Sequence, residues 1–275
     1  MKGLSNLMTI TQPAPARPAL LDLSQQVAAP QVTIILPTYN EAGNIEKLID
    51  RTLQALASHP GGAEILVVDD NSPDGTWQLA GQKAQANPQQ VRLIHRTTER
   101  GLTSALNRGI KEARGEWVGW MDCDMSMPPE AWPRLAEALA QGADVAIGSR
   151  YVPGGSDEAH TLTGRLFSRA INVWAGLLLG WSIKDYTSGF VMARRQVFTG
   201  LTLRGDYGEY CIDLLYRARQ AGYKIVELPY ICVPRMAGES KTAQNAWGYL
   251  KRGVNYVKVL FSLRFGGKEF TESSR

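Results

Sequence analysis

Residues 115–130 read "GEWVGWMDCDMSMPPE", and this stretch sets the pattern that decides the fold. An apolar run ends in two aspartates, Asp122 and Asp124, which stand on either side of Cys123. Pro128 and Pro129 follow, and proline is tolerated in the first turn of a helix. The stretch therefore predicts a buried strand, an acidic loop at its carboxyl end, and a helix.

The same pattern recurs along the first half of the chain. Short apolar runs alternate with segments whose apolar residues have helical spacing; the runs cover residues 32–36, 64–68, 91–94, 116–121 and 143–149. Strands that alternate with helices form right-handed βαβ units, which build a covered and mostly parallel sheet. The sequence thus predicts an α/β fold of the Rossmann-like type, in which Pro37 ends the first strand.

The overall composition is that of a globular protein. The chain has 275 residues, a hydrophobic fraction of 44% and a net charge of +4, which is too mild to indicate a nucleic-acid partner. Its three cysteines are widely spaced and form no CxxC pair, which argues against a disulfide framework or a zinc site and favours a reducing compartment. We identify no secretory signal.

No apolar segment reaches the roughly 18–20 residues that span a bilayer. The longest, residues 171–183, reads "INVWAGLLLGWSI" and is consistent with either a buried helix or an interfacial one. Near the C-terminus, aromatic and basic residues interleave over 246–270. That mixture suits an amphipathic helix on an anionic membrane, although a helix packed on the core remains the alternative.

Acidic residues follow three of the predicted strands. Glu41 follows the first strand, Asp70 the second, and Asp122 and Asp124 the fourth. In an open α/β sheet these positions meet at the edge where ligands bind. Converging carboxylates repel one another unless a cation or hydrogen-bond donors lie among them, and oxygen ligands suit Mg²⁺ or Mn²⁺. The GxGxxG, GK[ST] and GxSxG motifs are absent. The residues predict a nucleoside diphosphate held through a metal ion.

Several motifs, in this order, resemble the polyprenol-phosphate (dolichyl-phosphate) mannosyltransferase group of the family-two, GT-A-fold glycosyltransferases. They are "PTYNE" (37–41), "VVDDNSPDGT" (67–76), "RGLTSALNRGI" (100–110), "MDCDMSMPPE" (121–130), "GSRYVPGG" (148–155) and "RMAGESK" (235–241). The resemblance covers about residues 32–260. It implies an inverting transfer of a hexose, most directly mannose from GDP-mannose, to a polyprenyl monophosphate.

The resemblance also implies roles for individual residues. The metal ligands would be Asp122, Asp124 and Ser126, where some members have glutamine in place of the serine. The catalytic groups would be Asp122, Asp124, Arg150 and Arg235. Substrate contacts would come from Pro37, Tyr39, Glu41, Val68, Asp70, Cys123, Arg150, Arg165, Ser168, Arg235 and Lys241. Arg169 is a further candidate beside the acceptor phosphate, and Asp185 would either orient an arginine or form a structural ion pair.

The residue pattern and the resemblance together predict a domain plan and a location. We expect a flexible leader at 1–29, a GT-A catalytic domain at 30–240 and a basic amphipathic segment at 241–275 that lies on the membrane surface. The protein would be cytoplasmic and peripheral at the cytoplasmic face of a membrane. Its partners would be a nucleotide-sugar donor, a polyprenyl-phosphate acceptor and that membrane surface. The sequence does not indicate an oligomeric state.

Three other functions remain open at this point. The same fold could use UDP-glucose or a different lipid acceptor, since nothing in the sequence separates guanine from uracil recognition. A phosphatase of the haloacid-dehalogenase type would use Asp122 as its nucleophile, but that fold places its DxD motif after the first strand rather than the fourth. A non-catalytic membrane-associated binding module would have no need of the acidic pair with Arg150 and Arg235.

Overall fold

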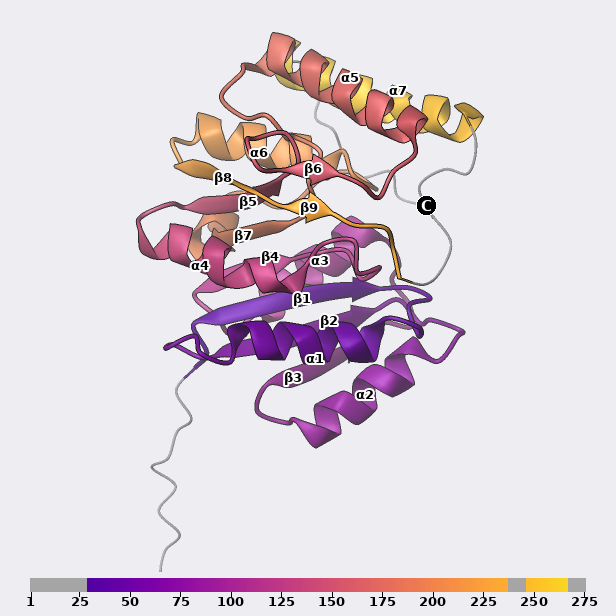
Figure 1. Ribbon diagram of the computed structural model, residues 1–275, viewed down its shortest axis with the longest axis vertical. Coiled ribbons are helices and arrows are strands. Elements are labelled where there is room, and N and C mark those ends of the chain that lie inside the picture. Colours follow the sequence, from indigo (N-terminus) through magenta and orange to yellow (C-terminus); the bar gives the residue numbers. More distant parts are fainter. Residues whose placement is uncertain (1–28, 237–245, 267–275) are drawn as a thin grey trace, which may run out of the picture.

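A seven-stranded sheet forms the centre of the protein (Figure 1). The computed structural model describes residues 29–236 and 246–266. The strands of the sheet lie in the order β3-β2-β1-β4-β7-β5-β8. Their bounds are β1 Val32–Thr38, β2 Ala63–Asp69, β3 Val91–His95, β4 Trp117–Trp120, β5 Val145–Ser149, β7 Val191–Arg194 and β8 Ile225–Pro229. A separate pair of short parallel strands joins β6 (Ser156–Asp157) to β9 (Ile231–Cys232).

The sheet is parallel except for β7. This strand runs antiparallel between β4 and β5, with Met192 opposite both Gly119 and Ala146. The other five strand pairings described in the two sheets are parallel, as the alternating pattern predicted. The predicted fold class, a mostly parallel sheet flanked by helices, is confirmed.

Helices cover both faces of the sheet. Their bounds are α1 Ile45–Leu56, α2 Thr76–Ala86, α3 Leu102–Glu112, α4 Trp132–Ala140, α5 Leu162–Leu179, α6 Tyr210–Gln220 and α7 Ala246–Phe265, with short 3₁₀ turns at Pro129–Ala131 and Arg195–Thr199. Ile34 and Leu36 belong to the apolar cluster of α1, α2 and α4, whereas Ile35 between them belongs to the cluster of α3, α5, α6 and α7. Side chains that alternate across the strand thus supply two cores.

The first strand is longer than predicted. It continues through Pro37 to Thr38, with Pro37 opposite Val68 of β2. Proline lacks an N–H group and so interrupts a central strand. Here β4 pairs with β1 only as far as Ile35, so Pro37 lies beyond the two-sided part of the strand. The expectation that Pro37 ends the strand was therefore wrong.

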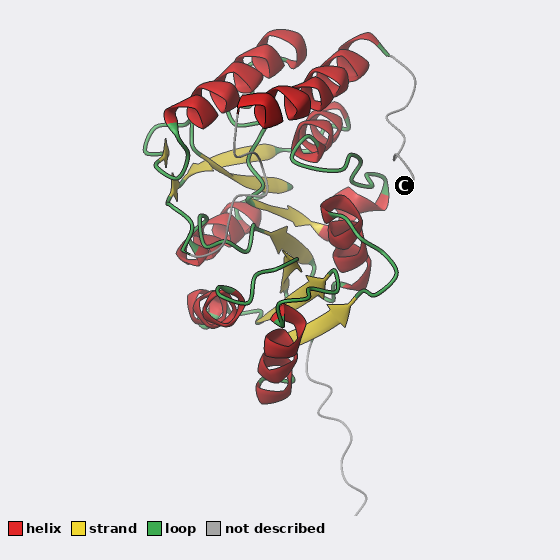
Figure 2. Cartoon of the chain, turned by 90° about the vertical axis from the view of Figure 1, so that its right-hand side faces the viewer, coloured by secondary structure: helices red, strands yellow, loops and turns green. Residues whose placement is uncertain are grey.

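Helices α5 and α7 lie side by side at one end of the molecule (Figures 1 and 2). Ile171, Ala175 and Leu179 of α5 are buried, while Trp174 and Leu177 are 54% and 62% exposed. The segment at 171–183 thus has both a packed side and an apolar exposed side. Among the described residues, no helix combines the length and apolarity that a membrane crossing requires.

Candidate active site

One cavity lies beyond the carboxyl ends of β1, β2 and β4. It encloses about 620 Å³. Most of the predicted site residues line it: Pro37, Tyr39, Glu41, Asp70, Asp122, Cys123, Asp124, Ser126, Arg150, Ser168 and Arg235. The convergence that was expected at this edge of the sheet is therefore present, and it joins residues that are up to about 200 positions apart in the chain.

Two predicted substrate residues lie elsewhere. The Val68 side chain is fully buried in the core between the sheet and α3, so any nucleotide contact at this position would have to involve its main chain. Arg165 lines a second, smaller cavity. The prediction for Lys241 falls outside the described residues.

The loop after β4 holds the two aspartates in a tight turn. The Ser126 N–H donates to Oδ1 of Asp124 at 3.0 Å, and Met125 between them has a φ of +68°. A positive φ is unfavourable for a residue with a side chain, and such strain persists where surrounding contacts fix it. Asn40 and Asn71, in the loops after β1 and β2, also have positive φ. Asparagine adopts this conformation readily, so the backbone strain lies at Met125 in the acidic loop.

Arg235 is bound to this loop. Its Nη2 atom lies 3.1 Å from Oδ2 of Asp124. Two main-chain hydrogen bonds, from Val233 to Ser126 and from Met236 to Asp124, join the same segments at 3.0 and 3.2 Å. The chain that follows β9 therefore packs on the acidic loop, and it supplies the cation that the sequence predicted there.

Asp122 lies in an electrostatically unfavourable position. The protein around its carboxylate disfavours the charged form although the residue is open to the cavity, and Asp124 and Glu41 add negative charge, so the pKa of Asp122 rises to about 7. Arg235 and Arg150 offset part of this effect. The Asp122 side chain keeps accessible surface, and that surface faces the cavity. A divalent cation would relieve the repulsion among these oxygens, so the residues present fit a Mg²⁺ or Mn²⁺ site.

Asp70 organises the loop beside the cavity. Arg96, a buried residue that the sequence did not single out, donates from Nε to Oδ1 of Asp70 at 2.7 Å. The Gly101 N–H donates to Oδ2 at 2.8 Å. The neighbouring Arg100 lines the cavity, with its guanidinium 6.0 Å from the centroid of the Tyr39 ring. Asp70 thereby holds the loop that carries Arg100, which lies near the Tyr39 ring on the cavity wall.

The loops after β1 and β2 are joined by main-chain donors. The N–H groups of Asn40, Glu41 and Ala42 donate to side-chain oxygens of Ser72, Thr76 and Asp74, at 2.8–3.0 Å. All three acceptors belong to the "DDNSPDGT" motif. These contacts fix the backbone of Glu41, so this motif acts as a support for the "PTYNE" loop.

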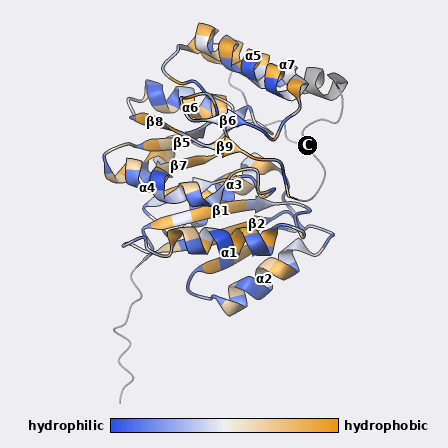
Figure 3. Cartoon of the chain, in the orientation of Figure 1, coloured by the Kyte–Doolittle hydropathy of each residue, from blue (hydrophilic) through white to orange (hydrophobic). Residues whose placement is uncertain are grey.

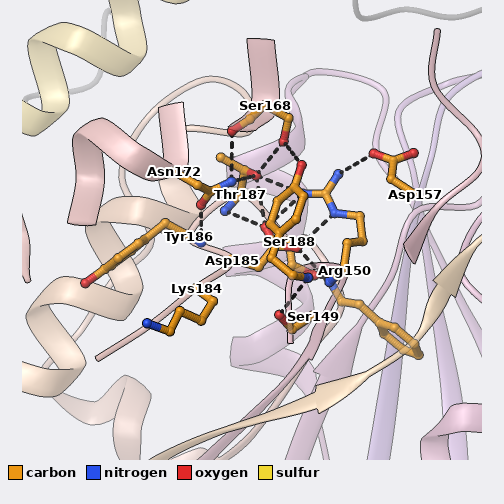
Figure 4. A network of polar contacts seen from close by, with 12 residues as sticks. Ser149, Arg150, Asp157, Ser168, Asn172, Lys184, Asp185, Tyr186, Thr187 and Ser188 are labelled. Atoms are coloured by element: carbon orange, nitrogen blue, oxygen red, sulfur yellow. Dashed lines mark hydrogen bonds and ion pairs between the residues drawn. The ribbon is translucent and has the colours of Figure 1, made fainter. Parts of the chain in front are cut away.

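Arg150 is the centre of a buried polar network (Figure 4). Its Nε and Nη2 atoms donate to the two carboxylate oxygens of Asp185, each at 2.8 Å, and Nη2 also donates to Oγ1 of Thr187. Its Nη1 lies 3.4 Å from Oδ2 of Asp157. Burial disfavours the charged guanidinium, but the attraction of Asp185 outweighs it and raises the pKa of Arg150 above its usual range. Asp185 thus both orients the arginine and neutralises it.

A second cavity of about 170 Å³ lies beside Arg150 and is lined by Arg165 and Arg169. These two arginines come from successive turns of α5. Ser168, between them, lines the main cavity; its Oγ is 2.9 Å from the Tyr151 hydroxyl and 3.2 Å from Thr187. Two predicted acceptor residues therefore lie in adjoining cavities, and Arg150 contributes to both.

The structure also brings His160 to the main cavity. No sequence pattern singled out His160, because it follows none of the predicted strands. Its Nδ1 atom lies 2.9 Å from Oδ1 of Asp157, the residue that also contacts Arg150. His160 thus lines the main cavity, and its partner Asp157 lines the second one.

The model of "Glycosyl transferase family 2" matches residues 33–201. The chain belongs to this family. Its relatives include a dolichol-phosphate mannosyltransferase of Pyrococcus furiosus, 41% identical over 83% of this chain and 64% of that protein. A polyprenol monophosphomannose synthase of Mycolicibacterium smegmatis is 40% identical over 76% of this chain and 79% of its own length. An undecaprenyl-phosphate mannosyltransferase of Micrococcus luteus is 35% identical over 86% and 97%.

Solved structures show the same fold at lower identity. Glucosyl-3-phosphoglycerate synthase from Mycobacterium tuberculosis, in complex with Mn²⁺, UDP-glucose and phosphoglyceric acid, matches with a TM-score of 0.63 and 22% identity. The match covers 86% of this chain and 80% of that one. The predicted relationship to the polyprenol-phosphate mannosyltransferase group is confirmed by these relatives. The chain spans less than two thirds of the length of the Pyrococcus protein.

Proposed function

We propose that this protein transfers mannose from GDP-mannose to a polyprenyl monophosphate, with inversion at the anomeric carbon. Three relatives at 35–41% identity are named as mannosyltransferases or a mannose synthase for such lipids. The observation that carries the proposal is the pairing of two adjoining sites. An acidic cavity with Asp122, Asp124 and Arg235 lies next to a cationic one with Arg165 and Arg169.

The acidic cavity is the proposed donor site. Asp122 and Asp124 would hold Mg²⁺ or Mn²⁺, and the Ser126 hydroxyl is the proposed third protein ligand. When bound, the ion neutralises charge on the departing diphosphate. Arg235, already 3.1 Å from Asp124, lies where it adds a positive charge to the same region. Tyr39, in the loop after β1, and Arg100, in the loop after β3, would contact the nucleoside from the cavity wall that they share.

The cationic side is the proposed acceptor site. An oxygen of the acceptor phosphate would attack the anomeric carbon as the bond to the nucleoside diphosphate breaks. A phosphate monoester has a second pKa of about 6, so the acceptor is already mostly dianionic at neutral pH and needs no strong base. What it needs is cations, and Arg165 and Arg169, both exposed on α5, supply them next to Ser168 and the rigid Arg150 network.

The apolar surface of α5 and α7 is the proposed membrane contact. Side chains exposed there are Leu162, Leu166, Val173, Trp174, Leu177, Trp181, Val254, Val257, Phe261 and Phe265. Figure 3 shows apolar residues along both helices at this end of the molecule. Lys184 and Arg264 lie next to aromatic rings of this group, an arrangement that suits an anionic lipid surface. A peripheral position at the cytoplasmic face would bring the acceptor phosphate to α5.

A transfer assay with a panel of donors tests the proposal. The purified protein is incubated with a short-chain polyprenyl phosphate, Mn²⁺ and either labelled GDP-mannose or labelled UDP-glucose, and label in the organic phase is counted. We expect label from GDP-mannose. Label from UDP-glucose alone would replace the donor assignment. No label from either donor would favour a binding module over an enzyme.

A further inference from the structure

Three potential metal-ligand atoms, an oxygen, a nitrogen and a sulfur, lie close together at a place separate from the Asp122–Asp124 pair. Asp157, His160 and Cys232 each direct one ligand atom into a group in which all the atoms lie within 4.8 Å of one another. Asp157 on β6 and Cys232 on β9 are paired residues of the short parallel sheet. His160 lies three residues after Asp157, and its N–H donates to Asp157 at 3.1 Å. The main chain on both sides is therefore fixed by hydrogen bonds.

The donor set selects one class of cation. An imidazole nitrogen, a thiol sulfur and one carboxylate oxygen suit zinc and similar borderline-soft ions, whereas Mg²⁺ requires oxygen ligands. In tetrahedral zinc sites, neighbouring ligand atoms lie about 3.3–3.8 Å apart. Nδ1 of His160 is 2.9 and 3.0 Å from the two Asp157 oxygens, so adjustments of less than about 1 Å would open room for the ion.

We propose that Asp157, His160 and Cys232 form a second cation site, selective for zinc-type ions and separate from the Asp122–Asp124 site. A solvent or substrate oxygen reaching from the main cavity would be the fourth ligand, since His160 and Cys232 both line that cavity. The sequence argued against zinc because no CxxC pair is present. The site instead joins one cysteine to two residues that lie more than 70 positions earlier.

The local charges can accommodate one divalent ion. Arg150 faces this group and is shared between Asp157 and Asp185, both buried, and Arg165 and Arg169 line the small cavity beside Asp157. The three side chains together carry one net negative charge. A bound divalent ion that displaces the Cys232 thiol proton adds one net positive charge, which brings the cluster to neutrality. In the metal-free protein, burial raises the pKa of Cys232 to about 12, so the thiol remains protonated until an ion binds.

The ion would hold in place the segment from Cys232 to Arg235, which borders the main cavity. Cys232 ends β9, and the chain runs directly on through Val233 to Arg235, which pairs with Asp124. A metal bond from Cys232 to Asp157 would tie this segment to the loop that precedes α5. Occupancy of the site is therefore expected to stabilise the folded protein by mass action.

Cobalt provides a direct probe, because a Co²⁺–thiolate bond absorbs in the near ultraviolet and Mg²⁺ is silent. Co²⁺ is titrated into the full-length protein in excess Mg²⁺, which keeps the acidic site filled. We expect one equivalent of Co²⁺ to give the charge-transfer band, Zn²⁺ to abolish it by competition, and Zn²⁺ to raise the Tm. Cys232→Ser and His160→Gln should each lose both effects.

Cys211→Ala is the matched control, since Cys211 is also buried and lines the same cavity but stands outside the group. It should keep the band. Absence of a band in the wild type, an unchanged band in Cys232→Ser, or its loss in Cys211→Ala would each overturn the proposal. His160→Gln changes a half-exposed side chain, so it remains informative if the cysteine variant does not fold. None of these readouts requires transferase activity, so the outcome is independent of the proposed reaction.

Discussion

Asp122 shows how a single residue can be costly to the fold when no ion is bound. Its carboxylate shares the cavity with Asp124 and Glu41, and its pKa lies near 7 rather than at the ordinary value of 3.8. Between pH 3.8 and about 7, the Asp122 carboxyl is therefore protonated in the folded protein but ionised in the unfolded chain. The stability of the wild type should fall as pH rises through that window.

This fall in stability with rising pH leads to a prediction for the Asp122→Asn variant, measured in the presence of a chelator. Asparagine cannot ionise, so the variant should escape the loss of stability that the wild type suffers at high pH. We expect the Tm of the variant minus that of the wild type to be larger at pH 8 than at pH 5, as measured by calorimetry. An equal difference at both pH values would show that Asp122 titrates normally.

Arg150 and Asp185 form a second residue-scale test. Both are buried, and their two hydrogen bonds are 2.8 Å long. Removing one partner of a buried ion pair typically costs about 3–5 kcal/mol, because the other charge is left uncompensated. Asp185→Asn should therefore lower the free energy of unfolding in urea by about 3 kcal/mol, with Asp157 retaining part of the interaction.

Glu130→Gln is the matched control for that measurement. Glu130 also accepts two hydrogen bonds from one arginine, Arg51, but this pair is on the surface. Exposed pairs contribute about 0–1 kcal/mol. Similar losses in the two variants would mean that burial does not determine the strength of the Arg150 network.

The candidate site residues divide according to the kind of signal they left in the sequence. Glu41, Asp70, Asp122 and Asp124 follow strands directly, so the apolar pattern placed them at one edge. Arg96 also directly follows a strand, β3, but as a single basic residue it was not singled out, and its role depends on its contact with Asp70. His160 follows none of the predicted strands and reaches the site through its contact with Asp157. Long-range pairing of this kind has no local pattern from which it could be predicted.

Strand β7 shows the same limit at the scale of elements. Its four residues, "VMAR", follow a polar stretch and lack the helix spacing that marks the βαβ units. Insertion between β4 and β5 makes it a strand, since both neighbours supply hydrogen-bond partners. The five strands in the first half were predictable because each is flanked by a helix and was read from its own apolar run.

Helix α5 divides its residues between the core and the exposed side. Its sequence pattern was therefore consistent with both a buried helix and an interfacial one.

The exposed side of α5 leads to a prediction about membrane binding. Trp174→Ser combined with Leu177→Ser should weaken sedimentation with phosphatidylglycerol vesicles at least about tenfold, because burial of one large apolar side chain contributes about 1.5–3 kcal/mol. Ile231→Ser, an exposed apolar residue on β9, is the control and should bind as the wild type does. Equal binding by all three proteins would remove α5 from the membrane contact.

For the whole molecule, the sheet supplies one acidic edge, and the segments after β5 supply the cations opposite it. Arg165 and Arg169 belong to α5 and share a cavity with Arg150, while Arg235, after β9, contacts Asp124 of the acidic loop. A donor diphosphate and an acceptor phosphate are both anions. This division would place the donor diphosphate next to the metal ion and the acceptor phosphate next to the arginines. The proposed transfer takes place where the two cavities adjoin at Arg150.

The most direct measurement compares the wild type with Asp124→Asn in mannose transfer from labelled GDP-mannose to a polyprenyl phosphate in Mn²⁺. The substitution keeps the size of the side chain and removes the charge beside Asp122. We expect wild-type label in the lipid phase and a loss of about 100-fold or more in the variant, with its circular dichroism spectrum unchanged. Transfer by Asp124→Asn at the wild-type rate, or no transfer from GDP-mannose by the wild type, would contradict the proposed function.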